Sequence, residues 1–157
     1  MDDLKKQYRG ALFIALSMFA CLFIYAALVE FLRTGPNAPT PQNGPQMDLI
    51  RMILFAAAAL SAVASFLVKK LILAGASGKT APGPKLLGAT VVSFALCESL
   101  AIYGLVLFFL TGGTLDFFIL LGCSFILFVL NFPRYSSWEE YAHGGQADST
   151  GLGKIEP

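Results

Sequence analysis

Four long apolar runs limit what this sequence can fold into. They cover about residues 11–32, 49–73, 86–110 and 115–132. Each approaches the roughly 20 residues that a helix needs to cross a hydrocarbon core of about 30 Å. Lipid offers no hydrogen-bond partners, so a crossing segment satisfies its backbone groups internally, as a helix. The sequence therefore predicts an all-α membrane protein with four transmembrane helices.

The composition agrees with a membrane protein. The 157 residues are 56% hydrophobic and only 13% charged, whereas a soluble domain carries about 25% charged residues. The first run follows the basic residues Lys5, Lys6 and Arg9. Its apolar core is longer than the roughly 7–15 residues of a signal peptide, so we expect a helix that is retained.

Lysine and arginine predict the orientation of the chain. The N-terminus has three of these basic residues, the loop at 69–85 has four and the tail has two. If both termini lie on the same side of the membrane, nine of the eleven basic residues lie on that side. The other two, Arg33 and Arg51, flank the loop between the first two helices. Because basic loops favour the cytoplasmic side, we expect a multi-pass protein of the inner (cytoplasmic) membrane with cytoplasmic termini.

Beyond the predicted transmembrane domain, residues 1–132, the chain becomes polar. Residues 133–157 are expected to form an interfacial segment and a flexible tail. Ser137 precedes Glu140 by three residues, a capping-box pattern. The rings that suit the headgroup zone there are Tyr135, Trp138 and Tyr141.

Several polar features have ordinary structural explanations. The string "GASGKT" ends like a phosphate-binding loop, but Leu73 stands where that motif requires its first glycine. Glu30 can pair with Arg33, and Asp116 suits the positive end of the fourth helix. His143 has no constellation around it, and the three cysteines lack paired spacing. We expect no catalytic site, no cofactor, no metal and no nucleic-acid partner.

Glu98 is the exception among the charged residues. It lies in the middle of the apolar run Leu86–Leu110, where no other residue is charged. A charge at mid-bilayer costs about 2.5–3.5 kcal/mol on insertion scales, a cost that a carboxyl group lowers by staying protonated. A group that is neutral in lipid and charged in water is suited to carrying a proton. The alternative is a protonated carboxyl that only bonds a neighbouring helix.

The neighbours of Glu98 suggest how it is accommodated. Ala95 and Ala101 present small surfaces on the same side of the helix, which lets another helix approach. Ser99 and Tyr103 supply hydroxyl groups one and five positions further on. Neither stands four residues away, so contacts across subunits and within the helix are both open.

The second run contains a stripe of small residues that permits close helix packing. Its repeat of four residues indicates packing within the chain or an oligomer seam. The residues concerned are Ala57, Ala58, Ser61, Ala62 and Ser65.

The string "FALCESLAIYGLVLFFL" (94–110) resembles the carboxylate-bearing helix of subunit c, the rotor-ring protein of rotary ATP synthases. Residues 49–110 follow that family's order: a small-residue helix, a polar cytoplasmic loop and a helix with a central carboxylate. The resemblance implies a ring of many copies and an ion-binding role for Glu98, with Ser99 and Tyr103 as supporting ligands. The helices at 11–32 and 115–132 are additions to that hairpin.

The first helix also echoes the third. The string "IYAALVEFL" (24–32) matches "IYGLVLFFL" (102–110) at an offset of 78 residues. This echo is compatible with an internal duplication.

Three functional hypotheses follow from these patterns. The leading one is a homo-oligomeric, subunit-c-like protein in which Glu98 binds a proton for ion translocation, within a larger membrane complex if it has partner subunits. Alanine and serine replace that family's repeated glycines and its loop signature is missing, which favours a non-transporting structural or accessory protein instead. A small proton-coupled exporter is the third, since such proteins also combine four helices with one membrane carboxylate.

Overall fold

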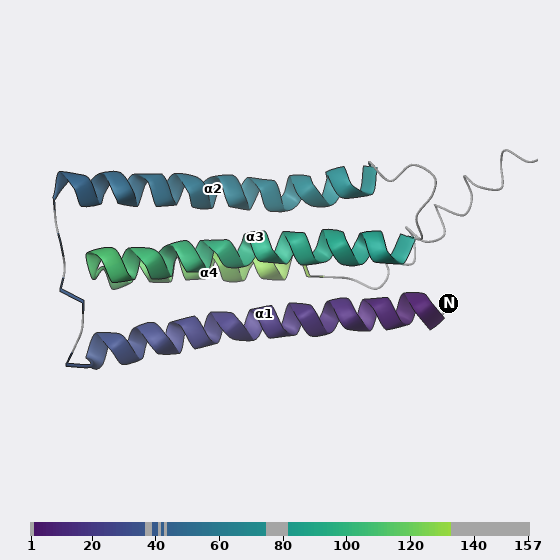
Figure 1. The fold of residues 1–157 in the computed structure, drawn as a ribbon, viewed down its shortest axis with the longest axis horizontal. Helices are drawn as coiled ribbons and strands as arrows, with labels where there is room; N and C mark the ends of the chain where they lie inside the picture. The colour runs from purple at the N-terminus through teal and green to yellow at the C-terminus, as the bar shows by residue number, and fades with distance from the viewer. Residues whose placement is uncertain (1, 37–38, 41, 43, 75–81, 133–157) are drawn as a thin grey trace, which may run out of the picture.

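Helices and short connections, with no strand, make up the part of the protein that the structure describes. This structure is a computed structural model, and it describes residues 2–36, 39–40, 42, 44–74 and 82–132. Four helices follow in order: α1 Asp2–Thr34, α2 Pro45–Ala74, α3 Pro82–Thr111 and α4 Thr114–Leu130 (Figure 1). The predicted all-α class with four helices is confirmed.

Three of these helices are long and apolar enough to cross a membrane: α1 over Lys5–Thr34, α2 over Pro45–Val68 and α3 over Leu86–Thr111. The fourth, α4, is apolar but has only 17 residues. The chain is therefore a multi-pass membrane protein by the length and composition of its helices, and α4 is its short member.

The helices extend beyond the apolar runs from which they were predicted. α1 begins at Asp2 rather than near residue 11, because the basic segment before the apolar run contains good helix formers. α2 and α3 begin at Pro45 and Pro82, and proline suits the first helical position because its missing N–H has no partner there anyway. The apolar runs mark the part of each helix that suits lipid, not the whole helix.

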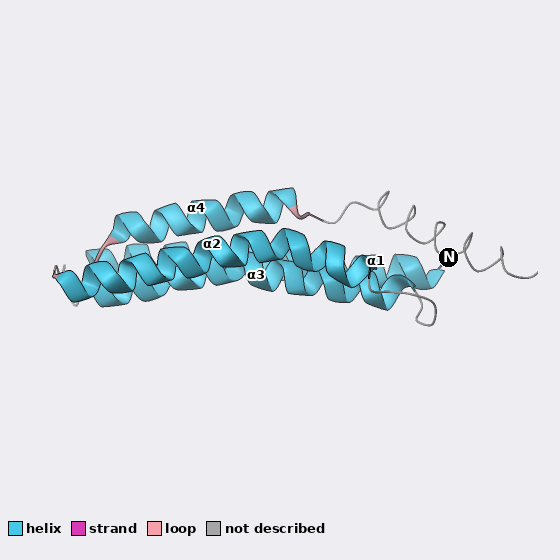
Figure 2. Ribbon diagram, turned by 90° about the horizontal axis from the view of Figure 1, so that it is seen from above, coloured by secondary structure: helices cyan, strands magenta, loops and turns pink. Residues whose placement is uncertain are grey.

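α3 is the central helix of the fold. It packs against α1, α2 and α4, and α1 also contacts α4. α2 and α1 lie on opposite sides of α3 (Figure 1), while α4 occupies a separate layer (Figure 2). The buried residues consequently concentrate on α3, where 44% of the membrane-length window is buried, against 17% for α1 and 11% for α2.

The inner face of α1 follows a seven-residue repeat. Positions at alternating steps of four and three lie against the core, as is usual where two helices pack along a seam. They are buried or partly buried: Ala11, Ala15, Met18, Leu22, Tyr25, Val29 and Leu32. Tyr25 is the only one of the seven with a polar group in its side chain.

α3 and α4 form an antiparallel hairpin, because the turn between them, from Thr111 to Thr114, is very short. Gly112 has a φ of 68°, and its N–H donates to the carbonyl of Phe108 at 2.9 Å. This is a helix end in the left-handed conformation, which glycine adopts without strain. The tight turn returns α4 directly along α3.

The two helices of this hairpin lie close together at Gly104. A Cβ atom there would lie 3.2 Å from the Cβ of Leu120 and 3.2 Å from backbone atoms of Phe117. Further along, the rings of Phe94 and Phe128 stack with centroids 4.9 Å apart. The absence of a side chain at Gly104 is what allows this separation of α3 and α4.

Polar contacts join the elements at the end of the bundle away from the N-terminus. Gln42, in the connection between α1 and α2, donates its backbone N–H to the carbonyl of Thr111 at 3.0 Å. Arg51 on α2 contacts the buried carboxylate of Asp116 on α4 at 2.6 Å. Asp116, predicted only to suit the helix start, therefore also ties α4 to α2.

The predicted pair at the end of α1 is present, with the Arg33 guanidinium 2.5 Å from Glu30. Other predictions fall outside the described residues. These are the segment "GASGKT" beyond Ala74, the interfacial segment and the flexible tail at 133–157, and His143.

Candidate functional site

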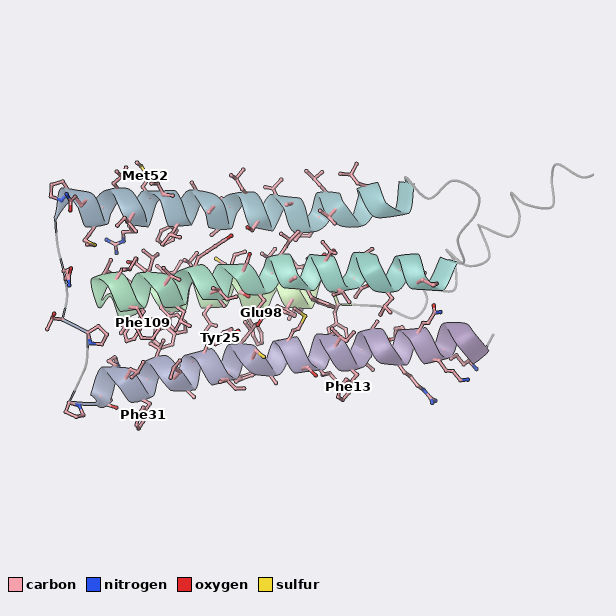
Figure 3. All side chains as sticks on the ribbon, viewed as in Figure 1. Phe13, Tyr25, Phe31, Met52, Glu98 and Phe109 are labelled. Carbon is pink, nitrogen blue, oxygen red and sulfur yellow. The ribbon has the colours of Figure 1, made fainter. Side chains whose placement is uncertain are left out.

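Glu98 lies in the seam between α1 and α3, where it is partly buried. Its Oε1 atom accepts a hydrogen bond from the Tyr25 hydroxyl at 2.8 Å. Figure 3 shows both residues between the two helices. The bond joins positions 73 residues apart in the sequence, so it depends on the packing of α1 against α3.

The repeat on α1 explains why Tyr25 reaches this carboxyl group. Tyr25 lies three residues after Leu22 and four before Val29, so it points into the same seam as those two buried side chains. Its ring packs against both main apolar clusters of the protein. The apolar part of the ring is thus held by packing, and the hydroxyl is presented to Glu98.

Glu98 has no ion-pair partner among the described residues. The described ion pairs are Arg33 with Glu30 and Arg51 with Asp116. Both of these lie near helix ends, whereas Glu98 is in the middle of the α3 span. A carboxylate in this position therefore has a hydrogen-bond donor, Tyr25, but no neutralising charge among the described residues.

The second oxygen of Glu98, Oε2, has no hydrogen-bond partner in the described part of the chain. The Glu98 residue is only partly buried, so the described helices do not enclose its side chain completely.

One side of α3 next to Glu98 is open. Ala95 and Ile102 flank Glu98 and are exposed, whereas Phe94 and Ala101 flank it on the other side and are fully buried. Glu98 thus stands at the border between the α1 seam and a side of α3 that no described helix covers. The two predicted small neighbours differ in this respect, since Ala101 lies in the core and Ala95 on the open side.

Ser99 and Tyr103 are turned away from the carboxyl group. Successive helical residues are about 100° apart, so a residue one or five positions after Glu98 points to another side. The Ser99 hydroxyl donates to the carbonyl of Leu96 at 2.7 Å. Tyr103 is partly buried against the apolar core. Their roles as supporting ligands remain predictions, and the residue in contact with Glu98 is Tyr25.

The sequence contains one signal for Tyr25, the echo between residues 24–32 and 102–110, in which Tyr25 corresponds to Tyr103. The echo does not show which tyrosine contacts Glu98, and we predicted a role only for Tyr103, which lies on the same helix as Glu98.

The small residues of α2 pack mainly against α3 within the same chain. Ala58, Ser61 and Ser65 are buried, and Ala57 and Ala62 are partly buried. The Ser93 hydroxyl of α3 donates to the backbone carbonyl of Ser65 at 3.3 Å. Of the two explanations for this stripe, packing within the chain accounts for the buried residues.

A second group of buried polar side chains lies where α2, α3 and α4 meet. The Ser124 hydroxyl donates to the carbonyl of Cys97 at 2.6 Å. The Asn131 amide donates to the carbonyl of Leu127 at 3.0 Å and contacts the Cys97 sulfur at 3.7 Å. These bonds satisfy the polar groups and fix the end of α4 against α3, so this group has a structural role.

No three His, Cys, Asp or Glu side chains of the described residues gather as a metal-binding group. Comparisons with protein-family models, with curated proteins and with solved structures found no match to this chain.

Proposed function

We propose that this protein binds and releases a proton at Glu98 within the membrane, as part of a homo-oligomeric, subunit-c-like assembly that translocates ions. The observation that carries the proposal is the bond between Glu98 and Tyr25 in the middle of the bundle. Intramembrane carboxyl groups are costly to keep and mark ion pathways in many membrane proteins. Here the group has a positioned partner and no counter-ion among the described residues.

Tyr25 is suited to both protonation states of Glu98. A tyrosine hydroxyl can donate to a carboxylate and can accept from a protonated carboxyl. The side chain of Tyr25 is held by its packing on two apolar clusters, so the same contact can persist when the proton arrives or leaves. A change of protonation then requires no rearrangement of the α1–α3 seam.

The position of Glu98 on α3 supports exchange of the proton with another molecule. Glu98 is only partly buried, and the exposed residues Ala95 and Ile102 lie beside it on the open side of α3. In an assembly this side would face a neighbouring copy or a partner subunit. A carboxyl group buried on all sides would lack such access.

The proposal is tested with dicyclohexylcarbodiimide, which modifies protonated carboxyl groups in apolar surroundings. We expect labelling of Glu98 that decreases as the pH rises, measured by mass spectrometry of the digested protein. The protein reconstituted in liposomes should conduct protons, and Glu98→Gln should abolish both labelling and flux.

Glu30→Gln is the matched control, because Glu30 lies at the exposed end of α1 and is paired with Arg33. It should leave the labelling of Glu98 and the proton flux unchanged. Absence of labelling at Glu98, or unchanged flux in Glu98→Gln, would show that the transport role is wrong.

A non-transporting structural protein is the second candidate. The burial of Ala58, Ser61 and Ser65 against α3 favours it, because these residues stabilise the chain itself and leave less of the stripe for a ring seam. In that case Glu98→Gln assembles as the wild-type protein does, and neither protein conducts protons. Particle images of both proteins in detergent, taken with the flux measurement, separate the two candidates.

A further inference from the structure

A cavity with polar and apolar lining lies at the end of the bundle that carries the α3–α4 turn. It has a volume of about 290 Å³ and is formed by the first turns of α2 and α4, the turn itself and Gln42. Pockets that enclose a whole drug-sized ligand are usually about 300–1,000 Å³. This cavity therefore suits a small polar group rather than a complete large ligand.

The lining of the cavity carries both signs of charge. Asp48, Arg51 and Asp116 all contribute to it, so two carboxylates and one guanidinium give a formal charge of −1. Nη2 of Arg51 contacts both carboxylate oxygens of Asp116. Nη1 and Nε have no partner among the described residues, and the side chain is 48% exposed. Arg51 can therefore bind an additional anionic group, and the exposed Asp48 can bind a cationic one.

Exposed apolar side chains follow two of the acidic lining residues along their helices. Met52 lies four residues after Asp48 and is 64% exposed, and Ile119 lies three residues after Asp116 and is 45% exposed. Residues three and four apart share a side of a helix, so each apolar side chain lies one turn deeper than the charged one. The cavity also stands where the spans of α2 and α3 end, at the level of lipid headgroups.

We propose that this cavity binds the headgroup of a zwitterionic phospholipid, with its acyl chains along α2 and α4. The phosphate lies against Arg51 and the ammonium group against Asp48. The net charge of the lining disfavours an anionic headgroup, whereas purely basic pockets between helices select anionic lipids. The site involves neither Glu98 nor Tyr25, so it is independent of the proposed proton binding.

Native mass spectrometry of the full-length protein in detergent tests this site. Phosphatidylethanolamine and phosphatidylglycerol with identical acyl chains are added at equal concentration. We expect phosphatidylethanolamine to be retained in preference. Asp48→Asn should reduce the ratio of the two by about two- to fivefold, the effect of an exposed ion pair. Asp48 is exposed, so its substitution leaves folding intact, which thermal unfolding checks.

The test has two controls, a variant at the end of α1 and a soluble headgroup without acyl chains. Glu30→Gln, which removes an acidic group at the end of α1, should leave the ratio unchanged. Soluble glycerophosphoethanolamine, which lacks acyl chains, should not displace the lipid. Equal retention of both lipids, an unchanged ratio in Asp48→Asn, an equal fall in Glu30→Gln, or displacement by the soluble headgroup would each overturn the proposal.

Discussion

At the scale of single residues, the contact between Tyr25 and Glu98 links a polar group to the packing of two helices. Hydrogen bonds between membrane helices contribute on average about 0.6 kcal/mol, with higher values of about 1–2 kcal/mol in model peptides. The Tyr25 ring also packs on two apolar clusters, and phenylalanine would keep that packing. The hydroxyl can therefore be removed with little other change.

We expect Tyr25→Phe to lower the free energy of unfolding by about 0.5–2 kcal/mol, measured by denaturation in mixed micelles. Tyr103→Phe is the control on the other tyrosine of the echo. A double-mutant cycle with Glu98→Ala, which removes both carboxyl oxygens, should show coupling for Tyr25 and none for Tyr103. Equal coupling for the two tyrosines would contradict the geometry of the site.

The sequence identified Glu98 because a carboxyl group in an apolar run is conspicuous by composition alone. It did not identify Tyr25, because tyrosine is an ordinary residue in a membrane helix. Its importance depends on which helix packs against α3 and in which register. Neither property follows from the periodicity of one helix, so a partner 73 residues away stayed hidden.

At the scale of the helices, Gly104 sets the distance between α3 and α4. A larger side chain there meets backbone atoms of Phe117, which cannot move aside as a flexible side chain can. Gly122 on α4 gives a contrasting case, because a Cβ atom there has no neighbouring atom within 4 Å. The two glycines have similar sequence surroundings but different packing.

Gly104→Leu should destabilise the protein by about 1–3 kcal/mol, the usual effect of overpacking a well-packed core. Gly122→Leu should change the stability little, because its side chain would point into open space. Denaturation of both variants in mixed micelles measures the difference. If Gly104→Leu lowered the stability no more than Gly122→Leu does, the close approach of α3 and α4 at Gly104 would be contradicted.

The elements themselves were largely predictable, and their contacts were not. Length and apolar character located the helices, and the short turn after Thr111 required α3 and α4 to be neighbours. The helices at 49–73 and 86–110 were also expected to pack against each other as a hairpin. That α1 would pack on the other side of α3, where it meets Glu98, depended on long-range contacts that the local patterns do not contain.

At the scale of the whole molecule, the distribution of basic residues predicts which ends of the helices face the cytoplasm. The start of α1 lies at the opposite end of the bundle from the connection that contains Gln42 (Figure 1). A membrane-impermeant thiol reagent distinguishes these ends in a variant without native cysteines. We expect Gln42→Cys to react in intact cells and Lys6→Cys to react only after permeabilisation, and the reverse pattern would contradict the predicted orientation.

The central position of α3 has a consequence for the order of assembly during synthesis. α1 and α2 enter the membrane first, yet they lie on opposite sides of α3 (Figure 1) and their buried faces pack against it rather than against each other. α1 and α2 are therefore expected to remain separate in the bilayer until α3 has been inserted. The ribosome must complete more than two thirds of the chain before the first stable tertiary contacts form.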